Sequence, residues 1–335
     1  MSLSEVLGVR HPIIQAPMAG VTTPKFVAAS AEAGVLGSIG AGYFSAEQTR
    51  NFIHEAKELT AKPFAVNLFI PEQVEIDKVV LQLANEALQP IRDELGITDH
   101  KITLSNSEFD GQIQVVIEEN VKICSFTFGL PDKKTIQLLK ANDVFLIGTA
   151  TTVEEAVLVE KAGMDAVVAQ GSEAGGHRGS FHGELTFIRL HELLKDIVKE
   201  VNIPVIAAGG IANKEQLDKA LSAGAEAVQI GTALLAAHES GANPQYKQAT
   251  LSAEEGCTEF TTAFSGKTAR GTRNRFIKEM KNAKIAPYPY QNDLTKEIRK
   301  VAAAQEKSEF MSLWAGENVH LNQAGSVADL IKRFI

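Results

Sequence analysis

Short apolar segments alternate along the chain with longer amphipathic segments, and this alternation restricts the fold more than any other feature. Each apolar segment has the length of a buried strand and is rich in Val, Ile, Leu, Phe or Ala. Strands that are apolar on both faces and are separated by helices are typical of a parallel sheet. Eight such segments occur, at 13–16, 35–39, 64–69, 121–128, 144–150, 166–169, 204–208 and 227–232.

Eight strand–helix units favour an α/β fold of the (β/α)8 TIM barrel type over an open sheet, because closure leaves no unprotected edge strand. Helix start signals fit between the strands; Ser45 and Gln48, for example, form a capping-box pattern. The charged, amphipathic segment 71–120 predicts a helical insertion after the third strand. Segment 236–335 predicts a mostly helical extension over the barrel mouth. Because no low-complexity linker occurs, we predict one domain over 1–335.

Composition and charge exclude several function classes. The 335 residues are 44% hydrophobic and 22% charged, as in ordinary globular proteins, which excludes disordered, collagen-like and membrane-spanning chains. Lys and Arg number 33 against 41 Asp and Glu, so the net charge of −8 offers no general attraction to nucleic acid or to anionic membranes. The two cysteines form no disulfide framework or zinc pattern, and the first ten residues lack signal-peptide features. We therefore expect a cytoplasmic protein with no nucleic-acid or membrane partner.

Glycines follow the last two predicted strands. Gly209 and Gly210 follow the segment 204–208, and Gly231 and Thr232 end the final one. The active site of a TIM barrel lies at the carboxyl ends of its strands, and these two loops commonly bind phosphate through backbone N–H groups. Any one of these glycines could serve only a tight turn, but together they predict a phosphorylated ligand.

The most informative segment is the glycine-rich loop 170–179, which follows the sixth predicted strand and carries His177. Histidine exchanges protons near neutral pH, and flanking glycines let it approach a ligand closely. A loop histidine is more often solvated, but the strand-end position opposite the predicted phosphate loops favours catalysis, with His182 as the fallback. Glu173, His177 and His182 lack helical spacing, so we expect no metal site. We leave Arg178 out of the site, because an arginine beside loop glycines is usually solvated.

Several segments resemble those of the FMN-dependent nitronate monooxygenases, formerly called 2-nitropropane dioxygenases. The resemblance extends over nearly the whole chain. Related flavin enoyl-acyl-carrier-protein reductases share the Glu-Ala-Gly-Gly-His stretch, but its Gly-His-Arg-Gly ending and the Ser-Leu-Trp-Ala-Gly segment look more like the nitronate enzymes. One departure is Glu317, where many relatives have Gln. The matching segments are 12–20, 126–129, 170–179, 204–211, 228–232, 264–267, 274–276 and 312–316.

The resemblance implies that FMN is the cofactor and that His177 is the catalytic residue. His177 would donate a hydrogen bond to the nitro oxygens of a nitronate, or remove the α-proton of a neutral nitroalkane. The residue types agree with FMN binding. Amide side chains can form hydrogen bonds with the donors and acceptors of the flavin ring, and glycines leave the backbone N–H groups open to the phosphate. Pro17 and Met18 are expected beside the ring. The cofactor-binding residues implied are Pro17, Met18, Asn67, Gln170, Gly175, Gly176, Gly209, Gly210, Gln229, Ile230, Gly231 and Thr232.

The activity implied is oxidation of alkyl nitronates by molecular oxygen to carbonyl compounds and nitrite, which would serve nitroalkane detoxification. The expected partners are a small nitronate or nitroalkane and oxygen, and the oligomeric state is left open. Two alternatives stay open. One is an NAD(P)H-dependent flavin reductase of the same fold, such as an enoyl-acyl-carrier-protein or quinone reductase. The other is a non-catalytic barrel that senses a phosphorylated ligand.

Several further side chains receive structural interpretations from the sequence. Lys267 and Arg270 are expected to face solvent, as basic residues in helices commonly do, and covering the phosphate is the alternative, because the family shares this segment. Tyr288 and Tyr290 either line a substrate mouth or form a packed turn. Trp314 is expected to anchor the C-terminal segment against the barrel.

Overall fold

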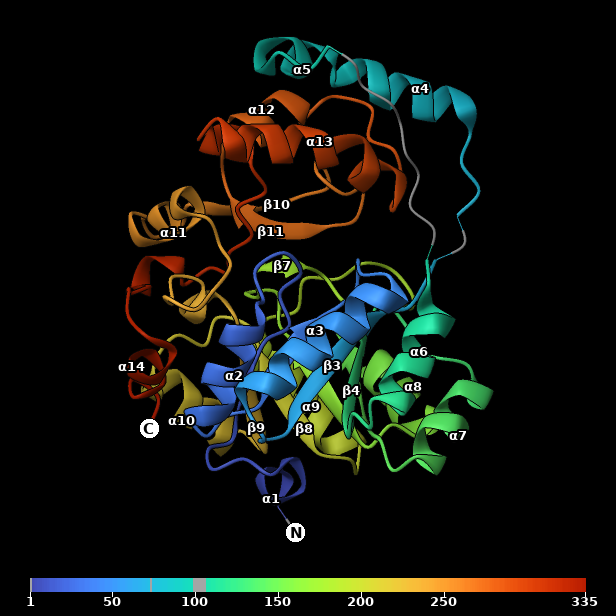
Figure 1. The fold of residues 1–335 in the computed structure, drawn as a ribbon, viewed down its shortest axis with the longest axis vertical. Helices are drawn as coiled ribbons and strands as arrows, with labels where there is room; N and C mark the ends of the chain where they lie inside the picture. Colours follow the sequence, from blue (N-terminus) through green and yellow to red (C-terminus); the bar gives the residue numbers. More distant parts are fainter. Residues whose placement is uncertain (1, 73, 99–106) are drawn as a thin grey trace.

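The computed structural model describes residues 2–72, 74–98 and 107–335, and its centre is one parallel sheet (Figure 1). The strand order is β1-β9-β8-β6-β5-β4-β3-β2, and a bridge between Ile14 and Leu36 brings the two ends of the sheet together. All eight predicted strands and the TIM barrel are therefore confirmed. The strands are β1 (Ile13–Gln15), β2 (Gly37–Gly40), β3 (Phe64–Phe69), β4 (Ile123–Thr127), β5 (Phe145–Ala150), β6 (Ala166–Gln170), β8 (Val205–Ala208) and β9 (Ala227–Ile230).

Helices surround the barrel, and most of them begin at a side-chain cap. Ser45 Oγ accepts a hydrogen bond from the Gln48 N–H, and Gln48 Oε1 accepts one from the Ser45 N–H, which forms the predicted capping box. Gly163, with φ of +92°, ends a helix where only glycine adopts that conformation without strain. The surrounding helices are α2 (Pro24–Glu32), α3 (Ala46–Leu59), α6 (Phe109–Glu118), α7 (Lys133–Ala141), α8 (Val153–Ala162), α9 (Leu190–Glu200), α10 (Lys214–Ser222) and α14 (Val327–Ile331).

The short helix α1 (Leu3–Leu7) closes the amino-terminal end of the barrel. Leu3 and Leu7 are buried in one cluster with strand residues such as Ile14, Ile123 and Ile206. Figure 1 places α1 below the strands, on the side away from the helical layer described next. One end of the barrel is therefore filled by apolar side chains, and the carboxyl ends of the strands are left for the site.

A second layer lies over the carboxyl ends of the strands (Figure 1). It contains α4 (Lys78–Ala87) and α5 (Gln89–Leu95) from the insertion and α12 (Arg275–Met280) and α13 (Tyr290–Ala304) from the extension. These helices share their own apolar cluster, and the buried Arg92 of α5 donates to the Leu294 carbonyl of α13. We call this layer the cap. The division of the chain into one domain with two elaborations stays a prediction.

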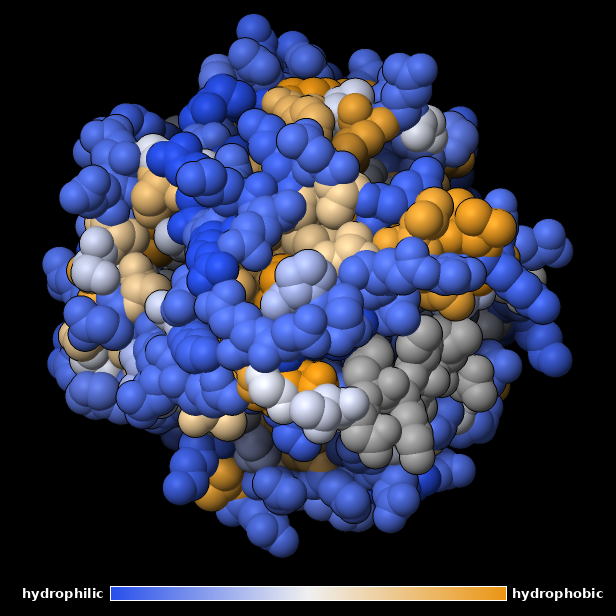
Figure 2. Space-filling view, turned by 90° about the horizontal axis from the view of Figure 1, so that it is seen from above, coloured by the Kyte–Doolittle hydropathy of each residue, from blue (hydrophilic) through white to orange (hydrophobic). Residues whose placement is uncertain are grey.

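The outer surface of the cap is mostly hydrophilic, with separate apolar patches (Figure 2). Part of the predicted insertion belongs to the barrel, since α6 packs against α3 and β3. The extension also contains α11 (Pro244–Leu251) and the single-turn helices η1 (Thr232–Leu234), η2 (Ser308–Phe310) and η3 (Val319–Leu321). Among the described residues, no helix combines the length and the apolar character needed to cross a membrane.

A small antiparallel sheet joins the barrel to the extension, and the sequence did not predict it. Its order is β10-β11-β7, from β10 (Thr258–Thr261), β11 (Ala269–Thr272) and β7 (Gly176–His177). Ala269 is the register partner of His177, and Arg270 is that of Gly176. The loop after β6 is thereby held by regular pairing to a hairpin far along the chain.

Candidate active site

A cavity of about 630 Å³ lies at the carboxyl ends of the barrel strands. Every site residue predicted from the sequence lines it, including His177, Asn67 and Gly210. The extension adds further lining residues to the same cavity, namely Ser265, Asn292, Arg299, Trp314 and Asn318. The structure thus brings the predicted set together, and the individual roles in cofactor binding stay predictions. His182, the fallback, is exposed and is not among the lining residues.

The glycines after β8 and β9 form a place where backbone can approach a ligand. Gly209 and Gly210 have φ of +126° and +69°, values that L side chains rarely adopt. A Cβ on Gly210 would lie 3.0 Å from the Cβ of Glu173, and the Gly210 carbonyl accepts a 2.6 Å hydrogen bond from Asn318 Nδ2. A Cβ on Gly231 would lie 3.3 Å from the Cβ of Ala16. This part of the cavity fits a phosphate group that is bound by backbone N–H groups.

Asn67 fits the polar edge of a flavin ring. Its Nδ2 donates hydrogen bonds to Ser125 Oγ at 3.0 Å and to Thr127 Oγ1 at 3.1 Å. Both amide hydrogens are thereby used, and none of the described residues donates to Oδ1, which leaves an acceptor at the cavity. A ring imide N–H is a donor of the kind that this oxygen needs.

Gln170 holds the histidine loop. Its Nε2 donates to the carbonyl of His177 at 3.0 Å, and its Oε1 accepts from the Gly179 N–H at 2.8 Å. The sequence assigned this amide to the flavin ring. In the structure its oxygen and one of its hydrogens bind backbone, so Gln170 fixes the position of His177 while also lining the cavity.

The imidazole of His177 lies between two aromatic rings. Its centroid is 5.7 Å from that of Phe128, edge to face, and 5.4 Å from that of Trp314. Nε2 lies 2.8 Å from Ser265 Oγ. Burial, together with the positive charges of Arg299 and Lys267, lowers the pKa of His177 to about 3. The imidazole is therefore neutral at physiological pH.

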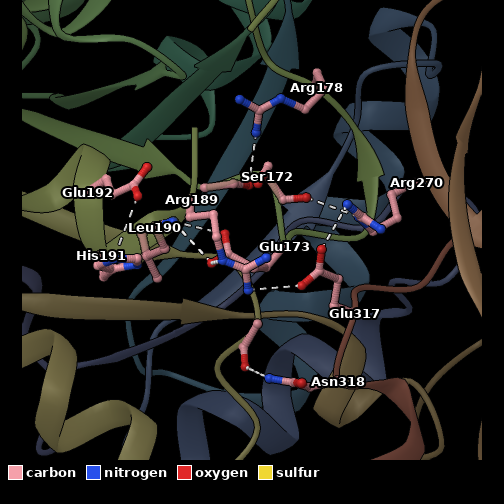
Figure 3. A network of polar contacts seen from close by, with 12 residues as sticks. Ser172, Glu173, Arg178, Arg189, Leu190, His191, Glu192, Arg270, Glu317 and Asn318 are labelled. Carbon is pink, nitrogen blue, oxygen red and sulfur yellow. Dashed lines mark hydrogen bonds and ion pairs between the residues drawn. The ribbon is translucent and has the colours of Figure 1, made fainter. Parts of the chain in front are cut away.

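Arg178 and Arg270 correct two expectations. Arg178 is only 1% exposed, and its guanidinium donates to the carbonyls of Gln170 at 2.9 Å and Gly171 at 2.8 Å. Arg270 is buried as well and donates from Nε to the Ser172 carbonyl at 3.0 Å (Figure 3). The expectation that both face solvent was wrong, because the carbonyls after β6 need donors and long guanidinium side chains reach them.

Glu317 connects the C-terminal segment to this loop (Figure 3). Its carboxylate lies 3.0 Å from the guanidinium of Arg270 and 3.1 Å from that of Arg189. Its backbone N–H donates to the Glu173 carbonyl at 3.1 Å. The position at which the sequence departs from many relatives therefore carries an ion-pair network against the loop that precedes His177.

Lys267 and Tyr288 lie next to the ring of Phe128. Lys267 forms an ion pair with Glu72, and its Nζ is 4.6 Å from the centroid of the Phe128 ring, so the expectation that it faces solvent was wrong. The ring of Tyr288 lies 5.6 Å from that of Phe128. Tyr290 instead donates from its hydroxyl to the Val74 carbonyl at 3.0 Å. Tyr288 therefore belongs to the aromatic wall near His177, and Tyr290 fastens α13 to the insertion.

Among the residues that line the cavity, sequence reasoning gave no site role to Tyr43, Phe128, Ser265 and Arg299. Phe128 and Ser265 lie within segments that carried the resemblance. The sequence therefore marked their positions but did not show what the two side chains do. Phe128 also has φ of +73°, and strain at a non-glycine residue is frequent at functional sites. Arg299 lies on one face of a helix with ordinary periodicity, which gives no signal.

Comparison with known proteins assigns the family. The family model described as nitronate monooxygenase matches residues 1–335. The chain belongs to the nitronate monooxygenase family. A probable nitronate monooxygenase of Staphylococcus haemolyticus (strain JCSC1435) is 44% identical over 340 residues, covering 99% of this chain and 95% of that protein. One of Staphylococcus aureus (strain Newman) is 44% identical over 325 residues, covering 95% of this chain and 92% of that protein.

Solved structures agree with the family. Nitroalkane oxidase from Streptomyces ansochromogenes has a TM-score of 0.93 at 37% identity, covering 99% of this chain and 96% of that chain. FabK from Thermotoga maritima has a TM-score of 0.79 at 31% identity, covering 100% of this chain and 94% of that chain. The resemblance seen in the sequence is confirmed, and this nitronate monooxygenase family member is a flavin-dependent oxidoreductase.

The burial of His177 predicts acid-sensitive folding of the flavin-free protein. Its pKa is about 3 when folded against an ordinary value of 6.5, so the unfolded chain binds more protons between these values. Stability is fully present above about pH 6.5 and falls as the pH decreases toward 3. At about pH 5 this one group is expected to cost about 2 kcal/mol.

Urea unfolding at about pH 7.5 and about pH 5 measures this effect. His177→Asn should lose less stability between the two values than the wild type does, by about 2 kcal/mol. His191→Asn, at a histidine whose side chain is 74% exposed, serves as the matched control and should behave as the wild type. Equal acid sensitivity of His177→Asn and the wild type would contradict the prediction.

Proposed function

We propose that the protein oxidises alkyl nitronates with molecular oxygen to carbonyl compounds and nitrite, with FMN as cofactor. The observation that carries the proposal is the neutral His177 in a cavity that the cationic Arg299 also lines. A nitronate is a carbanion whose charge is spread over its nitro group, so a cation at the cavity attracts it. The membership in the nitronate monooxygenase family supports the same activity.

The cofactor proposal rests on the two ends of the cavity. Gly209, Gly210 and Gly231 form the cradle for one phosphate, and Asn67 offers its acceptor to the ring. When bound, FMN supplies the acceptor that takes electrons from the nitronate and passes them to oxygen. FMN is favoured over FAD because the cradle suits a single phosphate.

The chain's own residues position the substrate and move its proton. The aromatic rings of Phe128 and Trp314 pack against the imidazole of His177 and hold it in place. A neutral nitroalkane must lose its α-proton, for which a neutral imidazole is a suitable base. A preformed nitronate needs no base, and Arg299 at the cavity stabilises its charge.

Anaerobic mixing of the purified yellow protein with propionate 3-nitronate, and separately with NADH, tests this function. The flavin absorbance should bleach with the nitronate and not with NADH, and readmitted oxygen should restore it with release of nitrite. Mass analysis of the released chromophore should identify FMN. FAD would refute the cofactor proposal.

The alternatives have distinct outcomes in the same experiment. The structural similarity to FabK, at 31% identity, is the reason to test the reductase alternative. Rapid bleaching by NADH or NADPH, with none by the nitronate, would replace the proposal by the reductase. A protein that binds no flavin even after reconstitution would favour the ligand-sensing barrel.

A further inference from the structure

We infer that Ser265 selects the tautomer of His177, so that Nε2 carries the hydrogen and Nδ1 is the atom that accepts the substrate's α-proton. Ser265 is thus a positioning residue that acts through the imidazole. The role of Nδ1 toward a nitroalkane rests on the proposed function. The tautomer itself does not depend on it, and this difference decides the design of the test.

The hydroxyl of Ser265 is surrounded by three possible partners. The side chain is 1% exposed, and Oγ lies 2.8 Å from His177 Nε2. Oγ donates to the Lys267 carbonyl at 3.0 Å and accepts from the Lys267 N–H at 3.3 Å. A serine hydroxyl has one hydrogen and two lone pairs. It can therefore donate either to the carbonyl or to the imidazole, but not fully to both.

The two possible directions of the Ser265 hydroxyl differ in how many polar groups keep a hydrogen-bond partner. If the hydroxyl donates to the Lys267 carbonyl, Nε2–H donates to Oγ, and only the Nδ1 lone pair is left without a partner among the described residues. If the hydroxyl donates to Nε2, the Lys267 carbonyl loses the one hydrogen bond it has from the described residues. The hydrogen then sits on Nδ1, where none of the described residues accepts it.

The energetic difference follows from this count. Taking away the hydrogen bond of the Lys267 carbonyl costs about 1–3 kcal/mol, whereas a spare lone pair on a nitrogen that lines a cavity costs little. The Nε2–H tautomer is therefore the stable one. Its free lone pair is on Nδ1, which makes Nδ1 the proton acceptor and gives the hydrogen-bond donor of the imidazole to Ser265. Of the two roles that the sequence left open for His177, proton removal is the one that remains.

The ring cannot exchange its two nitrogens without losing contacts. Phe128 and Trp314 hold it on two sides, and the main chain of His177 is fixed by pairing with Ala269 and by the hydrogen bond from Gln170. A flip of the ring would remove Nε2 from Ser265. Ser265 thus sets the tautomer, and the two rings and the fixed main chain set the orientation.

The surrounding charges oppose a permanent proton on Nδ1. Lys267, paired with Glu72, and Arg299 both disfavour a positive imidazole. Tyr288 is neutral, since burial raises the pKa of its hydroxyl. The imidazole therefore stays an unprotonated base, and accepts the proton when the substrate becomes an anion beside it.

Long-range ¹H–¹⁵N correlation spectra of protein labelled with ¹⁵N-histidine test the tautomer directly. The Nε2–H and Nδ1–H tautomers give different cross-peak patterns with the ring carbon-bound protons. His177→Asn assigns the signal by its disappearance. We expect the Nε2–H pattern in the wild type, with and without flavin, and a mixture of tautomers or the Nδ1–H form in Ser265→Ala. Ser265→Thr, which keeps the hydroxyl, should restore the wild-type pattern.

Kinetics provide a second measurement. Ser265→Ala should lower kcat for a neutral nitroalkane roughly tenfold, while oxidation of the preformed nitronate stays near the wild-type rate. An Nδ1–H pattern in the wild type would overturn the inference even if the Ser265→Ala variant failed to fold. An unchanged Nε2–H pattern in a folded Ser265→Ala variant would overturn it as well. If the protein proves not to oxidise nitronates, the spectra still decide the tautomer, so the two failures are distinguishable.

Discussion

His177→Asn is expected to reduce turnover of a neutral nitroalkane by about 10²- to 10⁴-fold, the usual contribution of a positioned general base. The asparagine amide cannot accept the α-proton. It is smaller than imidazole and enters a place walled by Phe128 and Trp314, so flavin binding and fold should be kept. The preformed nitronate has already lost the proton, and its turnover should fall much less.

Steady-state rates on both substrates, at matched flavin occupancy, measure this difference. His182→Asn is the matched control, because His182 is exposed and is not among the residues that line the cavity, and it should keep both activities. An equal loss on both substrates would refute proton abstraction and leave His177 as a binding or electrostatic residue. Unchanged rates on both would remove it from the mechanism.

Gly210→Asp is expected to weaken flavin binding roughly 10²- to 10³-fold, so that the protein purifies without colour. Gly210 has φ of +69°, and its Cβ would lie 3.0 Å from the Cβ of Glu173. The new carboxylate would stand against both Glu173 and the expected phosphate. Two anions about 4 Å apart near a protein surface repel by about 4 kcal/mol, which corresponds to this loss of affinity.

Two control variants separate charge from backbone strain. Gly210→Ala adds the Cβ without the carboxylate and should retain more flavin than Gly210→Asp. Gly183→Asp adds the same carboxylate at a glycine with φ of +71° and no atom within 4 Å of the added Cβ, and should retain flavin fully. Flavin absorbance after gel filtration, relative to protein, is the readout. Full retention in a folded Gly210→Asp variant would place the phosphate elsewhere.

The sequence predicted the barrel because its strands are buried on both faces. Segments such as Phe64–Phe69 and Val205–Ala208 consist almost entirely of residues that a parallel sheet covers with helices, so composition alone reveals them. The cavity-lining glycines were found for a related reason. A residue that ends a barrel strand faces the site whatever its neighbours are.

The pairing of β7 with β11 could not be predicted in the same way. Gly176–His177 is too short to show alternation, and its partner β11 comes only after the last two barrel strands, α11 and β10. The burial of Arg178 was missed because arginine is usually exposed to solvent. Its guanidinium binds the carbonyls of Gln170 and Gly171, and only the folded structure shows that these carbonyls lie within its reach. The role of Ser265 likewise depends on an imidazole distant in sequence.

The antiparallel sheet β10-β11-β7 has a consequence for the order in which a growing chain acquires its parts. All eight barrel strands precede residue 231, whereas β11 and Ser265 come later and Glu317 later still. During synthesis from the amino terminus, the cradle glycines of the barrel emerge before the hairpin that holds His177. All eight strands of a nascent chain are therefore available before the segments that fix its proton acceptor, and the reactive arrangement depends on residues that are synthesised after the sheet.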